Sequence, residues 1–173
     1  YTNLLILFFY AYQLLLDQYP NCELHIFGAG NPETEGMYRY LDRLGIRDKV
    51  FFRGHQEDIV KTAIKEELAL SWFQGYNNDR PAGYAGIDIC TTGTPLICWD
   101  FHHAPINPFN KVYPHYKNLN KFVAITIEIL TNQEKAEELS IVQFEGTKKT
   151  RNVDDYISTL EQEYIRIFKL NNE

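Results

Sequence analysis

Short apolar runs alternate with longer segments of helical spacing along the whole chain, and this alternation constrains the fold more than any other feature. The runs expected to form strands cover 23–27, 50–52, 68–73 and 95–101, and the expected helices cover 4–16, 37–44, 57–68, 84–92, 119–130 and 152–170. Strands that alternate with helices predict an α/β fold with a parallel sheet and helices on both faces. Such sheets bind ligands beyond the carboxyl ends of their strands.

Length and composition favour one globular domain over 1–173. The 173 residues suffice for a substantial core, and 45% of them are hydrophobic. A net charge of −6 argues against nucleic acid as a partner, because such a surface needs a basic stripe. Cys22, Cys90 and Cys98 are odd in number and not closely paired, so neither a disulfide framework nor a zinc site is expected, and a reducing compartment is favoured.

The first apolar run contains one polar residue, Gln13, between Leu4 and Leu16. It is too short to span a bilayer, and it lacks the basic start and the cleavage site of a signal peptide. We therefore expect a buried helix that ends near Asp17 and Pro20.

The segment from Arg80 to Cys98 combines features that suit an anion. Gly83 allows the backbone to approach a ligand closely, and it precedes a helix whose first amides lack intrahelical partners. The helix dipole favours negative charge at the same place. A phosphate or diphosphate is the expected ligand.

This segment resembles the donor-sugar segment of retaining GT-B glycosyltransferases, the glycosyl transferases group 1 family. Alignment on Gly93, Thr94 and Pro95 puts Gly83 on the family's second glycine and Asp88 on its second glutamate. Arg80 stands where the family has its first glutamate.

The order of the other segments is also similar to that family, including "YPNCELHIFGAG" at 19–30 and "LGIRDKVFFRGH" at 44–55. The resemblance covers nearly the whole chain. It implies a Rossmann-like, nucleotide-sugar-binding domain, the C-terminal half of a GT-B fold. It also implies that the domain's first strand, with a basic glycine turn, lies upstream of Tyr1.

The resemblance further implies a site for a nucleoside-diphosphate sugar. Asp88 would bind sugar or ribose hydroxyls and is the implied catalytic residue, while the base would lie near the end of the second strand. The implied donor-binding residues are Gly28, Gly30, Arg53, Gly54, His55, Arg80, Gly83, Tyr84, Ala85 and Asp88.

Simpler interpretations of these residues stay open. Gly28 and Gly30 can serve only as a turn, since the spacing of a dinucleotide fingerprint would need glycine at Glu33. Arg53 can be a solvated strand end, and Asp88 can merely complement the helix dipole.

Two further features concern the chemistry of the site. Arg80 can pair with phosphate but cannot accept sugar hydroxyl protons, a role that the adjacent Asp79 could take. No metal site is expected, because the adjacent His102 and His103 point to different sides of an extended chain near Asp100.

The expected function is transfer of a hexose from the donor to an acceptor hydroxyl in glycan or polysaccharide synthesis. The glycan or lipid-linked acceptor would bind an N-terminal domain, so this domain alone should be inactive. No cofactor is expected besides the donor substrate. The resemblance implies a cytoplasmic protein, peripheral at the inner face of a membrane only through other parts.

Two alternatives remain. A glycosyltransferase-like domain without catalysis, acting as a scaffold or partner-binding module, is favoured by Arg80. An epimerase or hydrolase of related fold would need more carboxylates or histidines in the site than the sequence offers.

Overall fold

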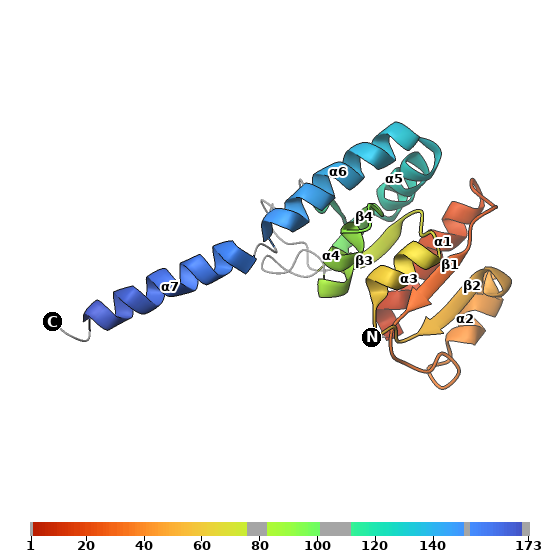
Figure 1. Cartoon of the computed structure of the whole chain (residues 1–173). Helices are drawn as coiled ribbons and strands as arrows, with labels where there is room; N and C mark the ends of the chain where they lie inside the picture. The colour runs from red at the N-terminus through yellow and green to blue at the C-terminus, as the bar shows by residue number, and fades with distance from the viewer. Residues whose placement is uncertain (1, 76–82, 101–111, 151–152, 171–173) are drawn as a thin grey trace.

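The computed structural model describes residues 2–75, 83–100, 112–150 and 153–170, and Figure 1 shows their arrangement. The helices are α1 (Thr2–Leu16), α2 (Met37–Leu44), α3 (Ile59–Lys65), α4 (Tyr84–Cys90), α5 (Leu119–Thr131), α6 (Gln133–Thr150) and α7 (Val153–Leu170), with a 3-10 turn η1 (Arg47–Lys49). The strands are β1 (Leu24–Phe27), β2 (Val50–Gly54), β3 (Ser71–Gly75), β4 (Leu96–Asp100) and β5 (His115–Tyr116). This order confirms the expected α/β alternation.

The strands pair in parallel but form two separate sheets. One sheet contains β1 and β2, with Leu24 opposite Val50, and the other has the order β3-β4-β5, with Ser71 opposite Leu96. Among the described residues, no strand joins β1 to β3.

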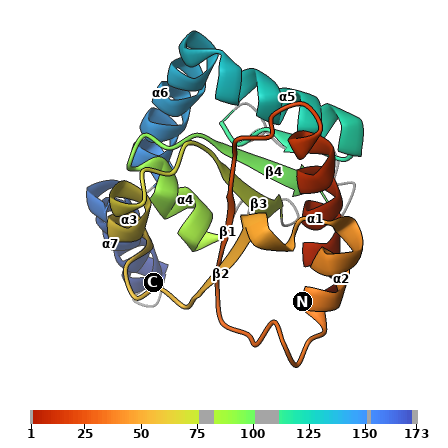
Figure 2. The same ribbon diagram turned by 90° about the vertical axis from the view of Figure 1, so that its right-hand side faces the viewer.

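Helices cover both faces of these strands, as predicted. The helix α1 packs against α2 and α5, whereas α4 packs against α3 and α6 (Figure 2). Aromatic side chains pack together between α1, β3 and α5. The centre of the Trp72 ring lies 6.0 Å from that of Phe8 and 5.1 Å from that of Phe122. The indole Nε1 of Trp72 donates a hydrogen bond to Thr126 Oγ1 at 3.1 Å, so its polar atom is satisfied.

The helix α1 is only partly buried, although its apolar sequence predicts a buried helix: Phe9, Ala11, Tyr12 and Leu15 are buried, Tyr10 is exposed, and its other described side chains are half-buried. Its Tyr12 hydroxyl donates to the carbonyls of Cys22 and Lys49, at 2.7 and 3.1 Å. These carbonyls lie just before β1 and β2, so the carboxyl-terminal part of α1 lies at the amino ends of the strands. No described helix is long and apolar enough to cross a membrane.

Several element ends differ from prediction by a few residues. The strand expected at 68–73 is β3 at 71–75, because α3 ends in a turn where Glu67 has a φ of 49°. Gly45 caps the carboxyl end of α2, with a φ of 67° and its amide bonded to carbonyls of that helix.

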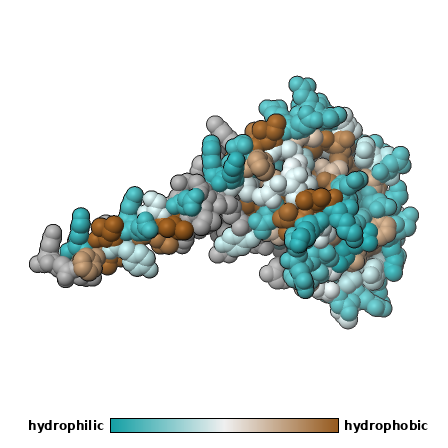
Figure 3. Space-filling model, in the orientation of Figure 1, coloured by the Kyte–Doolittle hydropathy of each residue, from teal (hydrophilic) through white to brown (hydrophobic). Residues whose placement is uncertain are grey.

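The helix α7 extends away from the rest of the molecule (Figure 1). Apolar side chains are visible along it in Figure 3. The exposed ones are Ile157, Leu160, Tyr164, Ile165, Ile167 and Phe168.

Candidate functional site

The carboxyl ends of β1 and β2 bring two of the predicted glycine segments together. The amide of Gly28 donates to the carbonyl of Gly54 at 2.9 Å. Gly28 and Gly30 have φ angles of 152° and 140°, and a Cβ at Gly30 would lie 3.0 Å from Glu35 Oε1. The turn itself therefore favours glycine at these positions, whether or not a ligand contacts it.

Arg53 lies on the same edge, exposed to solvent, yet its guanidinium is not isolated. Its Nε donates to His25 Nδ1 at 3.4 Å, and its Cζ lies 5.3 Å from the centre of the Phe51 ring. His25 in turn contacts Glu23 Oε2 through Nε2 at 3.0 Å. These neighbours hold Arg53 near the strand end, beside the exposed Gly54 and His55.

His25 is a contact of Arg53 that the sequence analysis did not identify. Because side chains alternate along a strand, His25 shares a face of the β1–β2 pair with Phe51, its register partner. The pairing could be recognised only once the register of β1 on β2 was known.

The helix α4 begins as the glycine-led segment predicts. Gly83 precedes the helix without a side-chain cap, and its carbonyl accepts hydrogen bonds from the amides of Gly86 and Ile87. The amides of Tyr84 and Ala85 come before this first intrahelical donor. Both residues are exposed, and Tyr84 retains 70% of its accessible surface.

Asp88 is the fifth residue of α4 and is half-buried. It lies three and four positions after Ala85 and Tyr84, so the three residues share one face of the helix. The dipole effect falls off within the first turn, and Asp88 lies beyond that turn. The dipole interpretation of this carboxylate is therefore weakened.

The opposite face of α4 is buried and includes Cys90, which contacts the carbonyl of Gly86 through Sγ at 3.4 Å. Burial raises the pKa of the Cys90 thiol to about 12 and also raises the pKa of Cys98. Neither thiol is therefore suited to act as a nucleophile near neutral pH.

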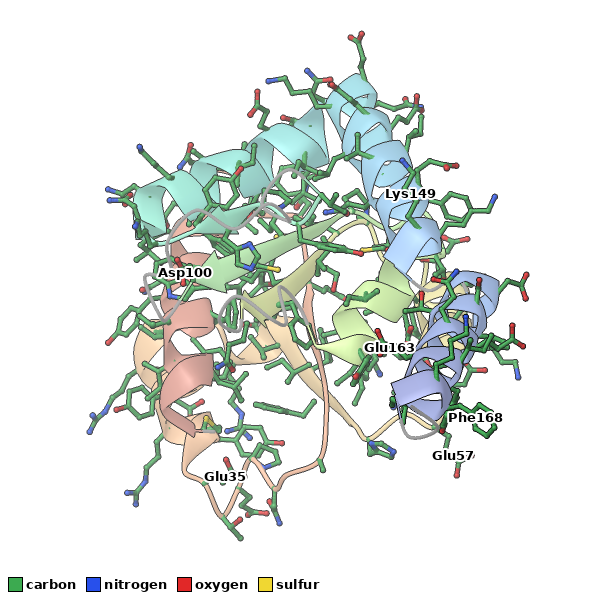
Figure 4. The ribbon with its side chains drawn as sticks, turned by 90° about the vertical axis from the view of Figure 1, so that its left-hand side faces the viewer. Glu35, Glu57, Asp100, Lys149, Glu163 and Phe168 are labelled. Atoms are coloured by element: carbon green, nitrogen blue, oxygen red, sulfur yellow. The ribbon has the colours of Figure 1, made fainter. Side chains whose placement is uncertain are left out.

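Some predicted residues lie outside the described part of the chain, namely Asp79, Arg80, His102 and His103. Asp100 ends β4, and Figure 4 labels it together with Glu35 of the loop that follows β1. Within the described ranges, no group of three or more His, Cys, Asp or Glu side chains is placed to hold a metal ion.

A hollow of about 450 Å³ lies away from these residues, at the amino ends of β3 and β4. Thr94 and Pro95 line it together with the acidic Glu67 and Glu137. Its position and charge make it a poor candidate for an anionic ligand.

No protein-family model and no curated protein sequence matches this chain. Solved structures do. TarM of S. aureus, which has also been solved in complex with UDP, superposes with a TM-score of 0.71 at 17% identity, over 90% of this chain and 31% of TarM. Sucrose-phosphate synthase from Thermosynechococcus elongatus gives a TM-score of 0.68 at 16% identity, over 94% of this chain and 42% of the synthase.

A third similar structure is the C-terminal domain of LpcC from Francisella tularensis, a glycosyl transferase group 1 family protein. Its TM-score is 0.60 at 11% identity, over 84% of this chain and 77% of that domain. This chain thus spans about a third of TarM and less than half of the synthase. The strand order, the helix layers and these superpositions show that the chain has the Rossmann-like fold of the C-terminal domain of GT-B glycosyltransferases.

Proposed function

We propose that this chain is the donor-binding domain of a glycosyltransferase. It would hold a nucleoside-diphosphate sugar whose hexose is transferred to an acceptor hydroxyl in glycan or polysaccharide synthesis. The observation that carries the proposal is that Gly28, Arg53 and Gly54 lie together at the carboxyl ends of β1 and β2, in a domain with a GT-B-type fold. The UDP complex of TarM supports the choice of ligand class.

The described residues suit different parts of such a donor. The first-turn amides of α4 and the guanidinium of Arg53 can donate to phosphate oxygens. The carboxylate of Asp88 can accept hydrogen bonds from sugar or ribose hydroxyls, and charged acceptors make the stronger bonds. Gly54 and the exposed His55 leave backbone accessible for a nucleotide base.

In this proposal, the acceptor site and the other catalytic residues lie in another part of the whole protein. An acceptor-binding N-terminal domain would face this edge, so the 173 residues alone should bind donor without turning it over. The sugar–phosphate bond would break and a new bond would form to the acceptor oxygen, whose proton is released, with the nucleoside diphosphate as leaving group.

A second candidate is a glycosyltransferase-like domain that binds a partner without catalysis. Arg80 favours it, because a guanidinium stands where the resemblance leads one to expect a carboxylate. Donor binding by the full-length protein without transfer to any acceptor would support this second candidate.

Calorimetric titration of the full-length protein with UDP and with UMP tests the donor site. We expect tighter binding of the diphosphate, because the α4 amides and Arg53 offer more donors than one phosphate group uses. Amide chemical shifts of Gly28, Gly54 and Ala85 should move on titration. No binding of any nucleoside diphosphate, or equal affinity for the two ligands, would contradict the proposal.

A further inference from the structure

His25 lies beside the candidate site but has no part in donor binding as described so far. Its side chain is mostly buried, with 14% of its surface accessible. Leu24 and Ile26 pack against the main core, so His25, which lies between them on β1, points to the other face of the β1–β2 pair. There the ring meets the Phe51 ring edge-on, with the ring centres 5.3 Å apart. A ring buried to this extent needs partners for both of its nitrogens.

The two nitrogens of the His25 ring have partners of opposite kinds. Nδ1 lies 3.4 Å from Nε of Arg53, and Nε2 lies 3.0 Å from Oε2 of Glu23. The Nε of an arginine always carries a proton and can only donate, so Nδ1 of His25 accepts and is itself unprotonated. The proton of the neutral ring is then on Nε2, where the Glu23 carboxylate accepts it. The two contacts therefore select one form of the imidazole, the neutral Nε2–H tautomer.

Arg53 occupies an irregular position in the strand pair. Phe52 lies opposite Ile26 on β1. The next matched pair is Gly54 with Phe27, so Arg53 is an extra residue with no counterpart on β1. A β-bulge of this kind bends the strand and changes the direction of a side chain. The side chain of Arg53 therefore depends on contacts outside the regular pairing to fix its direction.

Two contacts fix the guanidinium of Arg53 at this bulge. Its Nε donates to His25, and its Cζ lies 5.3 Å from the centre of the Phe51 ring, within the range of a cation–π contact. The hydrogen bond is longer than most, so both contacts are needed to hold the group. The N–H groups of the terminal nitrogens bind no other described residue. The edge of the guanidinium that can pair bidentately with phosphate is therefore open.

We propose that His25 is a positioning residue for Arg53 in donor binding. Glu23 holds the proton of His25 on Nε2, and the lone pair on Nδ1 then fixes Nε of Arg53. The open edge of the guanidinium is thereby presented to the phosphate oxygens of the donor, and His25 itself does not touch the donor. This inference rests on the proposed function, in which Arg53 donates to phosphate.

Packing is the competing role for His25. Its ring contacts the rings of Phe51 and Phe27, with the centres 5.3 and 6.4 Å apart. Packing does not require an acceptor at the position of Nδ1, whereas positioning of Arg53 does. Variants that differ in where residue 25 places its polar group therefore separate the two roles.

Two substitutions of His25 form a matched pair. The side-chain oxygen of asparagine reaches the position of Nδ1, whereas the side-chain amide of glutamine reaches that of Nε2. Both variants lose the aromatic ring, so both lose its packing against Phe51. By calorimetry on the full-length protein, we expect UDP to bind His25→Asn about 3- to 10-fold more tightly than His25→Gln, the effect of one hydrogen bond. Equal affinities in the two variants would overturn the proposal.

A double-mutant cycle shows whether His25 acts through Arg53. When Arg53→Ala is added to each variant, the affinities of the two proteins for UDP should lie within about 2-fold of each other. A difference as large as the one seen with Arg53 present would mean that residue 25 acts by another route, and it would overturn the proposal.

The nitrogen NMR resonances of the His25 ring give a readout that does not depend on the donor. Near neutral pH we expect a protonated Nε2 and an unprotonated Nδ1, and the Nδ1 resonance should shift in Arg53→Ala. A protonated Nδ1, or an Nδ1 resonance that does not respond to Arg53→Ala, would overturn the positioning role. If the resonances are as expected but the wild type does not bind UDP, the result supports the positioning of Arg53 and contradicts the proposed function.

Discussion

The side chain of Gln143 on α6 pairs with both backbone polar groups of Leu96, the first residue of β4. Its Oε1 accepts the Leu96 amide at 2.7 Å, and its Nε2 donates to the Leu96 carbonyl at 2.6 Å. Gln143 has no accessible surface. The Gln143 side chain therefore pairs with Leu96 as the backbone of a neighbouring strand would, and it fixes α6 against the sheet.

Replacing Gln143 with Leu should destabilise the protein by about 3 kcal/mol, because two buried backbone groups of Leu96 would lose their partners. Urea denaturation followed by circular dichroism measures the change. Gln133→Leu is the matched control, since Gln133 lies exposed in the first turn of the same helix and its side chain bonds to Glu137. Equal losses in the two variants would contradict the role assigned to Gln143.

Gly93 should tolerate alanine poorly for a conformational reason. Its φ is 83°, while a Cβ added at this position would have no atom within 4 Å, so the cost is backbone strain and not a clash. We expect Gly93→Ala to lower the free energy of unfolding by about 1 to 2 kcal/mol. Gly93→Asn should cost less, because asparagine adopts this backbone region more readily. Equal melting temperatures for wild type and Gly93→Ala would refute the strain argument.

The strands and helices could be predicted because their apolar runs and spacings are local. The region around Leu96 to Trp99 is a continuous apolar run, and β4 forms there. β5 could not be predicted, because two residues carry no periodic pattern. α6 gave a weak signal for a different reason: its buried positions include the polar Gln143 and Thr147.

The candidate site was predictable only as a set of segments. The glycine positions and the helix start were visible in the sequence, but the hydrogen bond between Gly28 and Gly54 depends on strand register. The same holds for the contact of Arg53 with His25. The division of the strands into two sheets could not be read from the sequence, since it depends on which distant segments pair.

Stability should fall as the pH rises above about 9, because burial raises the pKa of the Cys90 thiol from 9.0 to about 12. Between these values the unfolded chain has released a proton that the folded chain retains. Raising the pH between these values therefore favours unfolding. Below about pH 9 the Cys90 thiol is protonated in both the folded and the unfolded chain, so it causes no loss of stability there. The pKa of Cys98 and of Tyr12 is raised by burial as well, which adds to the same trend.

The measurement is the free energy of unfolding at about pH 8 and about pH 10 for wild type and Cys90→Ala. The alanine variant lacks one of the groups that titrate, so its stability should fall less between the two pH values. An identical fall in both proteins would show that Cys90 does not contribute. The loss of packing at the substituted position lowers the free energy of unfolding at both pH values. Comparing the change between the two pH values therefore isolates the effect of titration.

Asp88→Asn should weaken binding of a nucleoside-diphosphate sugar by about 10- to 100-fold in the full-length protein, since a lost charged acceptor costs about 1.5 to 3 kcal/mol. Its melting temperature should stay near that of wild type, because asparagine keeps the size and shape of the half-buried Asp88 side chain. Asp17→Asn is the matched control: Asp17 is exposed and follows α1, at the amino ends of the strands. Calorimetry with the donor, beside thermal melts of all three proteins, gives the comparison. Wild-type donor affinity in Asp88→Asn would remove this carboxylate from the proposed site, whereas a matching loss in Asp17→Asn would indicate a general effect of negative charge and not a contact at α4.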